Sequence, residues 1–125
     1  MNEKFIQNLD KLPADVRREF ALLANRYGEK KKQDTIQTDF LSFVKHVWPD
    51  FIEGSHHKRI ADKFNKLASG EIKRLIINMP PRHTKSEFGS YLLPAWMVGK
   101  NPKLKIIQST NTTELSVRFG RKAKA

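Results

Sequence analysis

Residues 74–88 read RLIINMPPRHTKSEF, and this stretch decides how the second half of the chain is interpreted. A short run of β-favouring residues leads into a Pro-Pro turn and then into a Lys-Ser pair that opens a segment with helical periodicity. A loop between a buried strand and a helix N-terminus presents free backbone amides and the positive end of the helix dipole to an anion. The order strand, loop, helix therefore predicts a phosphate-binding loop.

The loop lacks both glycines of the G-x-x-x-x-G-K-[ST] pattern, in which a lysine contacts phosphates and a hydroxyl contacts Mg²⁺. Met79 and Thr84 occupy the two glycine positions. Glycine permits a positive φ, and a β-branched threonine would be strained there. Either Thr84 keeps a negative φ or the site is weakened. Pro80 and Pro81 preset the turn without glycine but remove two amide donors. The alternative interpretation is a rigid connector without a ligand.

The rest of the second half predicts a strand and two helices. Residues 104–110 form a second short apolar strand, and helical periodicity follows behind an Asn or Thr cap. The segment 85–99 reads as a helix that Pro94 should kink or shorten. This order predicts a parallel α/β architecture with right-handed crossovers. Two strands are too few for an independent sheet, so we expect the chain to hold only part of the domain.

The first half predicts three helices. One follows Pro13 with Gly28 as an early stop, a second follows a cap at Thr38 or Asp39, and a third runs from Ser55 to Gly70. We expect a helical region over residues 1–54 and an incomplete phosphate-loop domain over residues 55–125. The two tryptophans, Trp48 and Trp96, are predicted to belong to the core rather than to stack on nucleic-acid bases.

The charge of the chain is concentrated towards its C-terminal end. The net charge is +11, and the last 55 residues carry 11 Lys and Arg against 3 Asp and Glu. Such a region attracts polyphosphate or nucleic acid, unless an acidic complement lies downstream. No apolar run approaches the roughly 18 residues of a membrane span, and no secretory signal is visible. The absence of cysteine fits a reducing compartment.

The string IKRLIINMPPRHTKSEFGSYLLPAWMVGKNPKLKIIQSTNTTELSVRFGRK resembles the start of the ATPase domain of tailed-phage terminase large subunits, the motors that pump DNA into procapsids. In that family the loop commonly reads P-P-R-H-G-K-S and is preceded by a short strand and by an upstream helix carrying His. The resemblance covers roughly residues 40 to 125. It implies a truncated P-loop NTPase of the RecA-like, additional-strand type, preceded by N-terminal helices.

The resemblance also implies roles for individual residues. Lys85 would contact the phosphates of ATP, Ser86 would bind Mg²⁺, and Arg82 would stabilise the γ-phosphate charge, unless it is only a solvated loop residue. His57 would lie near the adenine, unless it and His56 form a surface pair. The implied ATP site comprises His57 and the loop residues Pro80, Pro81, Arg82, His83, Thr84, Lys85, Ser86 and Glu87. A zinc site built from the four histidines is disfavoured because their spacing is unsuitable.

The family further implies partners and a location. These are double-stranded DNA, the portal protein, the terminase small subunit and further copies in a ring, at the procapsid portal in the host cytoplasm, without a membrane. No strand ending in Asp-Glu follows Leu104, and the acidic cluster of the family's nuclease domain is missing. We therefore expect weak ATP binding and negligible turnover from this chain. The alternatives are a basic DNA-binding module and a fragment of another P-loop ATPase such as a helicase.

Overall fold

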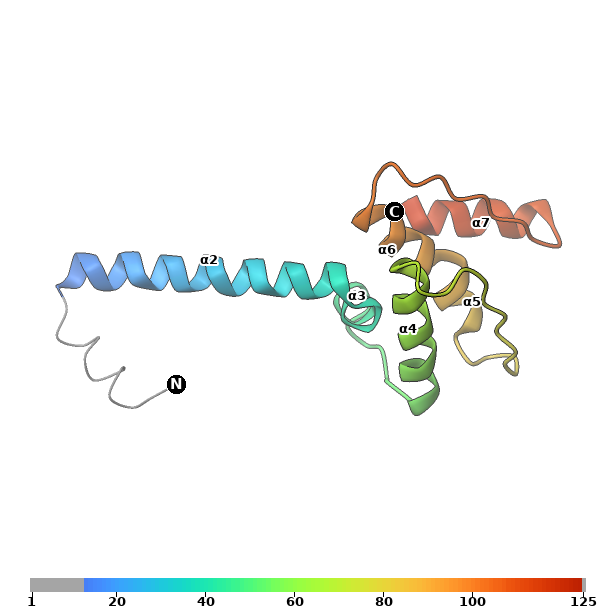
Figure 1. The fold of residues 1–125 in the computed structure, drawn as a ribbon, viewed down its shortest axis with the longest axis horizontal. Coiled ribbons are helices and arrows are strands. Elements are labelled where there is room, and N and C mark those ends of the chain that lie inside the picture. Colours follow the sequence, from blue (N-terminus) through green and yellow to red (C-terminus); the bar gives the residue numbers. More distant parts are fainter. Residues whose placement is uncertain (1–12, 125) are drawn as a thin grey trace. The chain divides into compact units, whose positions relative to one another are not determined.

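A computed structural model describes residues 13–124, and every regular element in that range is helical (Figure 1). The elements are α2 (Ala14–Thr38), α3 (Phe40–Val47), α4 (Ser55–Ala68), α5 (Lys85–Glu87), the π-helical η1 (Phe88–Leu92), α6 (Leu93–Lys100) and α7 (Thr113–Lys124). The chain divides between Asp34 and Thr35 into two compact units. The expected boundary after residue 54 lies inside the second unit, between α3 and α4.

The first unit contains most of α2, a helix without buried side chains. The sequence predicted an early end at Gly28, but the helix continues through this glycine to Thr38. An exposed glycine weakens a helix by only about 1 kcal/mol relative to alanine. The residues that follow it, Glu29 and Lys30 among them, are good helix formers and carry the helix onward.

The second unit is built around an aromatic core centred on Phe40. This side chain is fully buried and makes edge-on contacts with Phe64, Phe88 and Trp96, at ring-centroid distances of 5.0, 5.4 and 5.5 Å. The indole nitrogen of Trp96 donates a hydrogen bond of 3.0 Å to the carbonyl of Ile36. The prediction that Trp96 is a core residue is confirmed. The other buried apolar residues of this core are Val44, Ala61 and Leu92.

A polar network fixes the start of α3 against α4. Of the two expected caps, Asp39 is the one used: its carboxylate accepts hydrogen bonds from the Ser42 amide at 2.8 Å and the Ser42 hydroxyl at 2.7 Å. The Asn65 side chain donates to the same carboxylate, and its oxygen accepts from the Phe40 amide, both at 2.9 Å. The first turn of α3 is therefore tied to the middle of α4.

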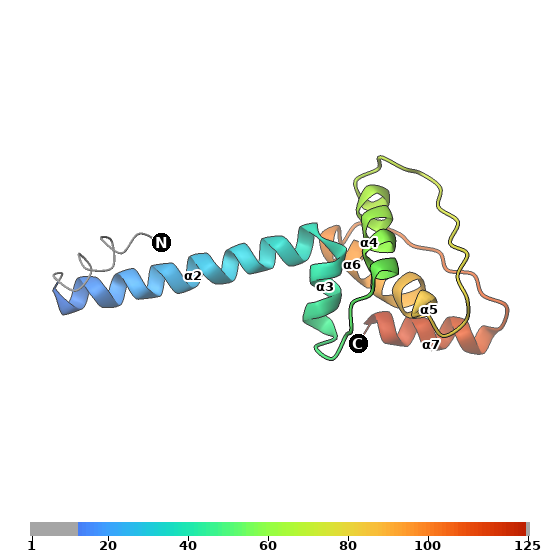
Figure 2. The ribbon, with the colours of Figure 1, turned by 90° about the horizontal axis from the view of Figure 1, so that it is seen from below.

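The helices α5, η1 and α6 follow one another without a break (Figures 1 and 2), and Pro94 explains the π-helical turn between them. Proline has no amide to give to the carbonyl four residues earlier, which is that of Ser90, and its ring crowds that carbonyl. The side-chain amide of Gln108 donates to the Ser90 carbonyl at 2.8 Å. The helix accordingly continues past Pro94 with a locally wider turn. Pro94 therefore disturbs the helix, as expected, but does not end it.

The expected α/β, RecA-like P-loop architecture is wrong, because residues 13–124 contain no strand and no sheet. Both predicted strands, near residues 74–79 and 104–110, are drawn as plain trace in Figures 1 and 2. Within the described range, no backbone hydrogen bond joins either segment to another extended segment. A strand requires a partner for its amides and carbonyls, and the β-favouring composition of these segments does not supply one.

Candidate functional site

The loop 79–84 leads into α5 with two non-glycine residues in the left-handed region. Thr84, the N-cap of α5, has φ +55° and ψ +10°, and Arg82 has φ +66°. Thr84 thus adopts the backbone conformation usually left to glycine, and the alternative in which it keeps a negative φ is wrong. Left-handed residues that alternate with other conformations turn successive amides towards one side and form an anion-binding concavity. Residues 82 and 84 therefore hold two strained left-handed conformations without glycine, immediately before Lys85.

Three hydrogen bonds close the loop on itself. The Lys85 ammonium donates to the Met79 carbonyl at 3.4 Å, so this side chain crosses the mouth of the loop. The His83 ring donates from Nδ1 to the Pro81 carbonyl at 2.9 Å, and the Thr84 hydroxyl donates to the His83 carbonyl at 2.7 Å. The loop is compact because its own side chains occupy its carbonyls, while its amides remain available.

The amides at the start of α5 have no intrahelical acceptor. The first bond of the helix runs from the Phe88 amide to the Thr84 carbonyl at 2.9 Å, which leaves the amides of Lys85, Ser86 and Glu87 at the free end. The helical stretch that continues through α6 adds its dipole at this end. Partial positive charge and free donors therefore coincide at residues 85–87.

The charged side chains of the loop face solvent. Arg82, His83, Lys85 and Ser86 are exposed, whereas Thr84 and Glu87 are half-buried. Neither Arg82 nor Lys85 forms an ion pair with any residue in the described range 13–124. Two uncompensated cations and the free amides give this end of the helix an electropositive, accessible surface.

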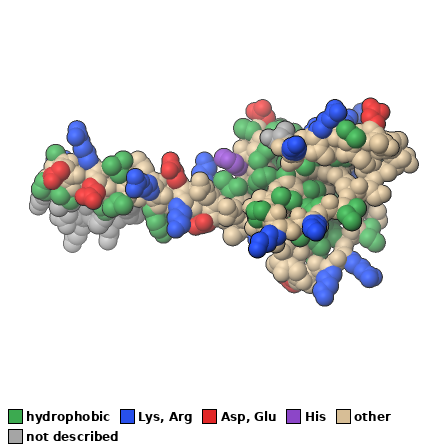
Figure 3. All heavy atoms as spheres, turned by 90° about the horizontal axis from the view of Figure 1, so that it is seen from above, with side chains coloured by type: hydrophobic (Ala, Val, Ile, Leu, Met, Phe, Trp, Pro, Cys, Tyr) green, Lys and Arg blue, Asp and Glu red, His purple; other side chains and the backbone are tan. Residues whose placement is uncertain are grey.

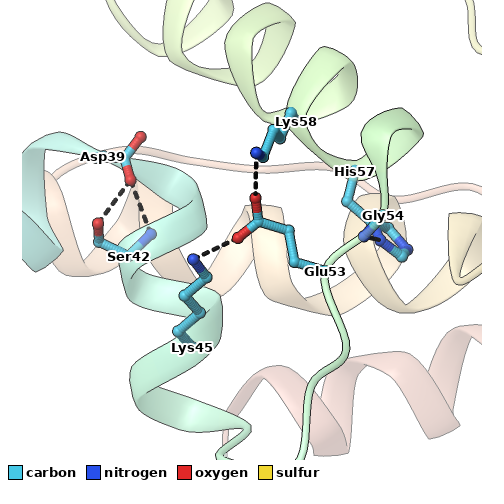
Figure 4. A network of polar contacts seen from close by, with 7 residues as sticks. All are labelled: Asp39, Ser42, Lys45, Glu53, Gly54, His57 and Lys58. Carbon is cyan, nitrogen blue, oxygen red and sulfur yellow. Dashed lines mark hydrogen bonds and ion pairs between the residues drawn. The ribbon is translucent and has the colours of Figure 1, made fainter.

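His57 lies beneath the loop rather than at an open face. It is 6% exposed and is the buried polar residue of the described chain. Its Nδ1 accepts from the Gly54 amide at 2.9 Å (Figure 4), and its Nε2 lies 2.7 Å from the Thr84 hydroxyl. The ring packs against Phe51 and Phe88 at centroid distances of 4.8 and 5.1 Å. Both ring nitrogens are engaged, so none is left for an adenine.

Burial lowers the pKa of His57 below its usual 6.5, and the neighbouring rings of His56 and His83 lower it further, while Glu53 acts in the opposite direction. The neutral imidazole is therefore the form that the fold stabilises at neutral pH. Because Nδ1 accepts a hydrogen bond from the Gly54 amide, the neutral ring carries its proton on Nε2 and directs it at the Thr84 hydroxyl.

The linker before α4 is held by an acidic anchor. Glu53 forms ion pairs with Lys45 of α3 and, at 3.1 Å, with Lys58 of α4 (Figure 4). A Cβ on the next residue, Gly54, would lie 2.9 Å from a carbon of the His56 ring, so a larger residue would require that ring to shift. The linker thereby delivers the Gly54 amide to His57 in a fixed position.

His56, the other member of the expected histidine pair, lines an open hollow of about 430 Å³ beside the loop. The hollow also borders Met79, the first residue of the loop, and the basic side chains of Arg59 and Lys63. Its remaining lining residues are Ile60, Leu75, Ile76, Ile77 and Asn78. Of the two neighbouring histidines, His56 and not His57 lines this hollow.

Residues 13–124 contain no group of three or more His, Cys, Asp or Glu side chains that could hold a metal ion. Ser86 presents its hydroxyl at the first turn of α5, next to Lys85. One hydroxyl suits Mg²⁺ when phosphate oxygens and waters complete the coordination. The fit to magnesium thus depends on a phosphate ligand.

Three contacts were not predicted from the sequence: Gly54 with His57, His57 with Thr84, and Gln108 with Ser90. His57 and Thr84 lie 27 residues apart, and a local sequence pattern does not reach across such a distance. One local signal existed: His57 is the third residue of α4, the position from which a side chain reaches back to the N-cap amide. The Gln108 contact had a local signal too, because a proline inside a helix leaves the carbonyl four residues earlier without its amide donor.

Comparison with protein-family models, curated proteins and solved structures gave no match. The terminase resemblance therefore rests on the residues quoted for it.

Within residues 13–124, no helix combines the length and the apolar character that crossing a bilayer requires.

Proposed function

We propose that the loop 79–84 and the first turn of α5 bind the phosphates of ATP with Mg²⁺, in the ATP-binding portion of a terminase large subunit that packages and cuts viral DNA. The observation that carries the proposal is the left-handed backbone at Arg82 and Thr84 immediately before Lys85. Strained backbone of this kind is retained where it shapes a site. The string PPRHTKSE supplies the same assignment from the sequence.

Each residue of the site has a distinct task in this proposal. The backbone amides of residues 84–87 donate hydrogen bonds to phosphate oxygens. Lys85 exchanges its contact with the Met79 carbonyl for a contact with the phosphates. Ser86 donates its oxygen to Mg²⁺, and Arg82 neutralises charge at the terminal phosphate. These tasks require the loop and the helix that follows it, and none of them requires a β-sheet.

The test is ATP affinity in the presence of Mg²⁺, measured by calorimetry on the wild type and on Lys85→Ala. We expect the affinity to fall about ten- to hundredfold, because a charge-assisted contact to phosphate is lost. Lys103→Ala is the matched control, since it removes the same charge from an exposed side chain outside the loop. Equal affinities of wild type and Lys85→Ala would refute the proposal.

Binding to double-stranded DNA is a second candidate function, favoured by α7. This helix carries Arg118, Arg121, Lys122 and Lys124 and a single acidic residue, Glu114. None of its cations forms an ion pair within the described residues. Lys and Arg side chains are spread over the face drawn in Figure 3, with hydrophobic side chains between them. Such a surface attracts a phosphate backbone without reading its sequence.

The salt dependence of DNA binding tests this second function. Replacing Arg118, Arg121 and Lys122 by glutamine should weaken binding to duplexes of any sequence and reduce the slope of log K against log salt by roughly 0.9 per lost phosphate contact. The triple change Arg17→Gln, Arg18→Gln and Lys30→Gln removes the same charge from α2. If both triple variants lose affinity equally, the effect comes from net charge and not from α7.

A further inference from the structure

His57 reaches Thr84 through a directional chain of hydrogen bonds. The Gly54 amide donates to Nδ1 at 2.9 Å, Nε2 donates to the Thr84 hydroxyl at 2.7 Å, and that hydroxyl donates to the His83 carbonyl at 2.7 Å. Once one group in this chain is assigned as donor or acceptor, the role of the next group is fixed as well. One imidazole therefore links the N-terminus of α4 to the loop by hydrogen bonds.

Aromatic rings pack around the imidazole of His57. Phe51 and Phe88, which contact each other at 5.5 Å, lie at centroid distances of 4.8 and 5.1 Å from it, and His56 lies at 3.8 Å. The Gly54 backbone is tied to His57 a second time, because its carbonyl accepts a hydrogen bond from the His57 amide at 3.1 Å. An imidazole locked in this way places its Nε2 proton at one point in space, and Thr84 is at that point.

Thr84 needs such a partner because its backbone is unfavourable for its residue type. A β-branched residue at φ +55° leaves the left-handed region easily unless surrounding contacts hold it there. Glycine would need no such contact. The other left-handed residue, Arg82, is exposed, so the hold on the loop is concentrated at Thr84.

We propose that His57 is a positioning residue, which holds Thr84 in the left-handed conformation and so replaces the conformational freedom of the missing glycine. The inference rests on the proposed function in one respect: the loop so shaped is the one that binds phosphate. His57 touches neither phosphate nor metal in this arrangement. It acts on them through Thr84.

A double-mutant cycle between His57→Phe and Thr84→Gly tests the inference. Phenylalanine keeps the ring packing and removes both hydrogen bonds, and glycine removes the need for them. The readout is the rate of tryptic cleavage after Arg82, followed by mass spectrometry without nucleotide, together with ATP affinity. We expect His57→Phe to accelerate cleavage about three- to tenfold in the wild-type background and to have little effect in the Thr84→Gly background.

His57→Gln is the conservative variant, since glutamine at the third helical position accepts from the N-cap amide and retains a donor. It should restore slow cleavage. Should His57→Phe not fold, as judged by circular dichroism, His57→Leu, which also removes both hydrogen bonds, takes its place in the two backgrounds. Equal acceleration by His57→Phe with Thr84 and with Gly at position 84 would overturn the inference, as would a failure of glutamine to slow cleavage. If the wild type binds no ATP, the proposed function fails, while the cleavage cycle still decides the role of His57.

Discussion

At Thr84, the hydrogen bonds of the side-chain hydroxyl and the conformation of the backbone depend on each other. The hydroxyl accepts from His57 and donates to the His83 carbonyl, so both of its hydrogen-bonding roles are used within the loop. Serine at this position would keep the hydroxyl and lose the β-branch that disfavours a positive φ. Threonine therefore has a more strained backbone than serine would have at this position. Its side chain is more restricted, so it loses less conformational entropy when it binds to His57.

The sequence alone could not decide this conformation. Threonine ordinarily indicates a negative φ, and nothing near Thr84 in the chain announces a partner, since His57 lies in another helix. The lysine and the serine of the loop were predictable because their chemistry is carried by residue type. The backbone at residues 82 and 84 was not, because it depends on contacts made after folding.

Asp39 gives a prediction at the same scale. Burial by itself would raise the pKa of this carboxyl, but hydrogen bonds from Ser42 and Asn65 outweigh it, and the pKa lies below its usual 3.8. A carboxyl with a lowered pKa stabilises the fold above its unfolded-state pKa, and this stabilisation is lost as the pH falls through the folded-state pKa. Asp39→Ala should therefore cost about 1–2 kcal/mol at pH 7 and less near pH 3.

Urea denaturation followed by tryptophan fluorescence at both pH values measures this difference. Asp50→Ala is the control, because Asp50 is exposed and makes no contact of this kind in the described chain. A gap between wild type and Asp39→Ala that stayed constant between pH 7 and pH 3 would contradict the explanation.

Among the elements, the helices were largely predictable and the strands were not. The starts of α3 and α7 lie where capping residues placed them, whereas α4 begins at Ser55 with Gly54 and not the expected Ser55 as its N-cap. In the segment 75–79, half-buried and exposed residues alternate, as the pattern of an extended chain requires. The strand predictions were wrong because a strand also depends on a second segment in register, which no local pattern encodes.

The helix 85–100 carries the second prediction, at its proline. Gln108→Ala should destabilise the second unit by about 1 kcal/mol, because the half-buried Ser90 carbonyl loses its donor. The loss should be smaller in a Pro94→Ala background, since alanine returns a backbone amide to that carbonyl. Thermal unfolding of the four proteins measures the coupling. Additive effects would show that Gln108 acts independently of Pro94, and Gln37→Ala on exposed α2 provides the baseline.

For the second unit as a whole, stability depends on one side chain more than on any pattern. Phe40 contacts aromatic residues from three other helical segments, so its removal opens a cavity between all of them. Phe40→Ala should lower the unfolding free energy by about 3–5 kcal/mol. Near-ultraviolet circular dichroism of the tryptophans measures the transition. Leu22→Ala, at an exposed position of α2, should shift it by no more than about 0.5 kcal/mol.

A loss below about 1 kcal/mol for Phe40→Ala would mean that the helices pack without this ring at their centre. Such an outcome would also separate Trp96 from the core, because its indole contacts the same ring.

The two extended segments have a consequence for the protein in solution. Ile76 is 86% exposed and Ile107 is 98% exposed, and both lie on backbone without a hydrogen-bonded neighbour in the described chain. An exposed, apolar, extended segment with unpaired backbone hydrogen-bonding groups is a template for aggregation between molecules. The net charge of +11 keeps molecules apart, and added salt shortens the reach of that repulsion from roughly 10 Å at 0.1 M to about 3 Å at 1 M. Light scattering should accordingly rise with salt, and Ile76→Lys with Ile107→Lys should keep the solution clear.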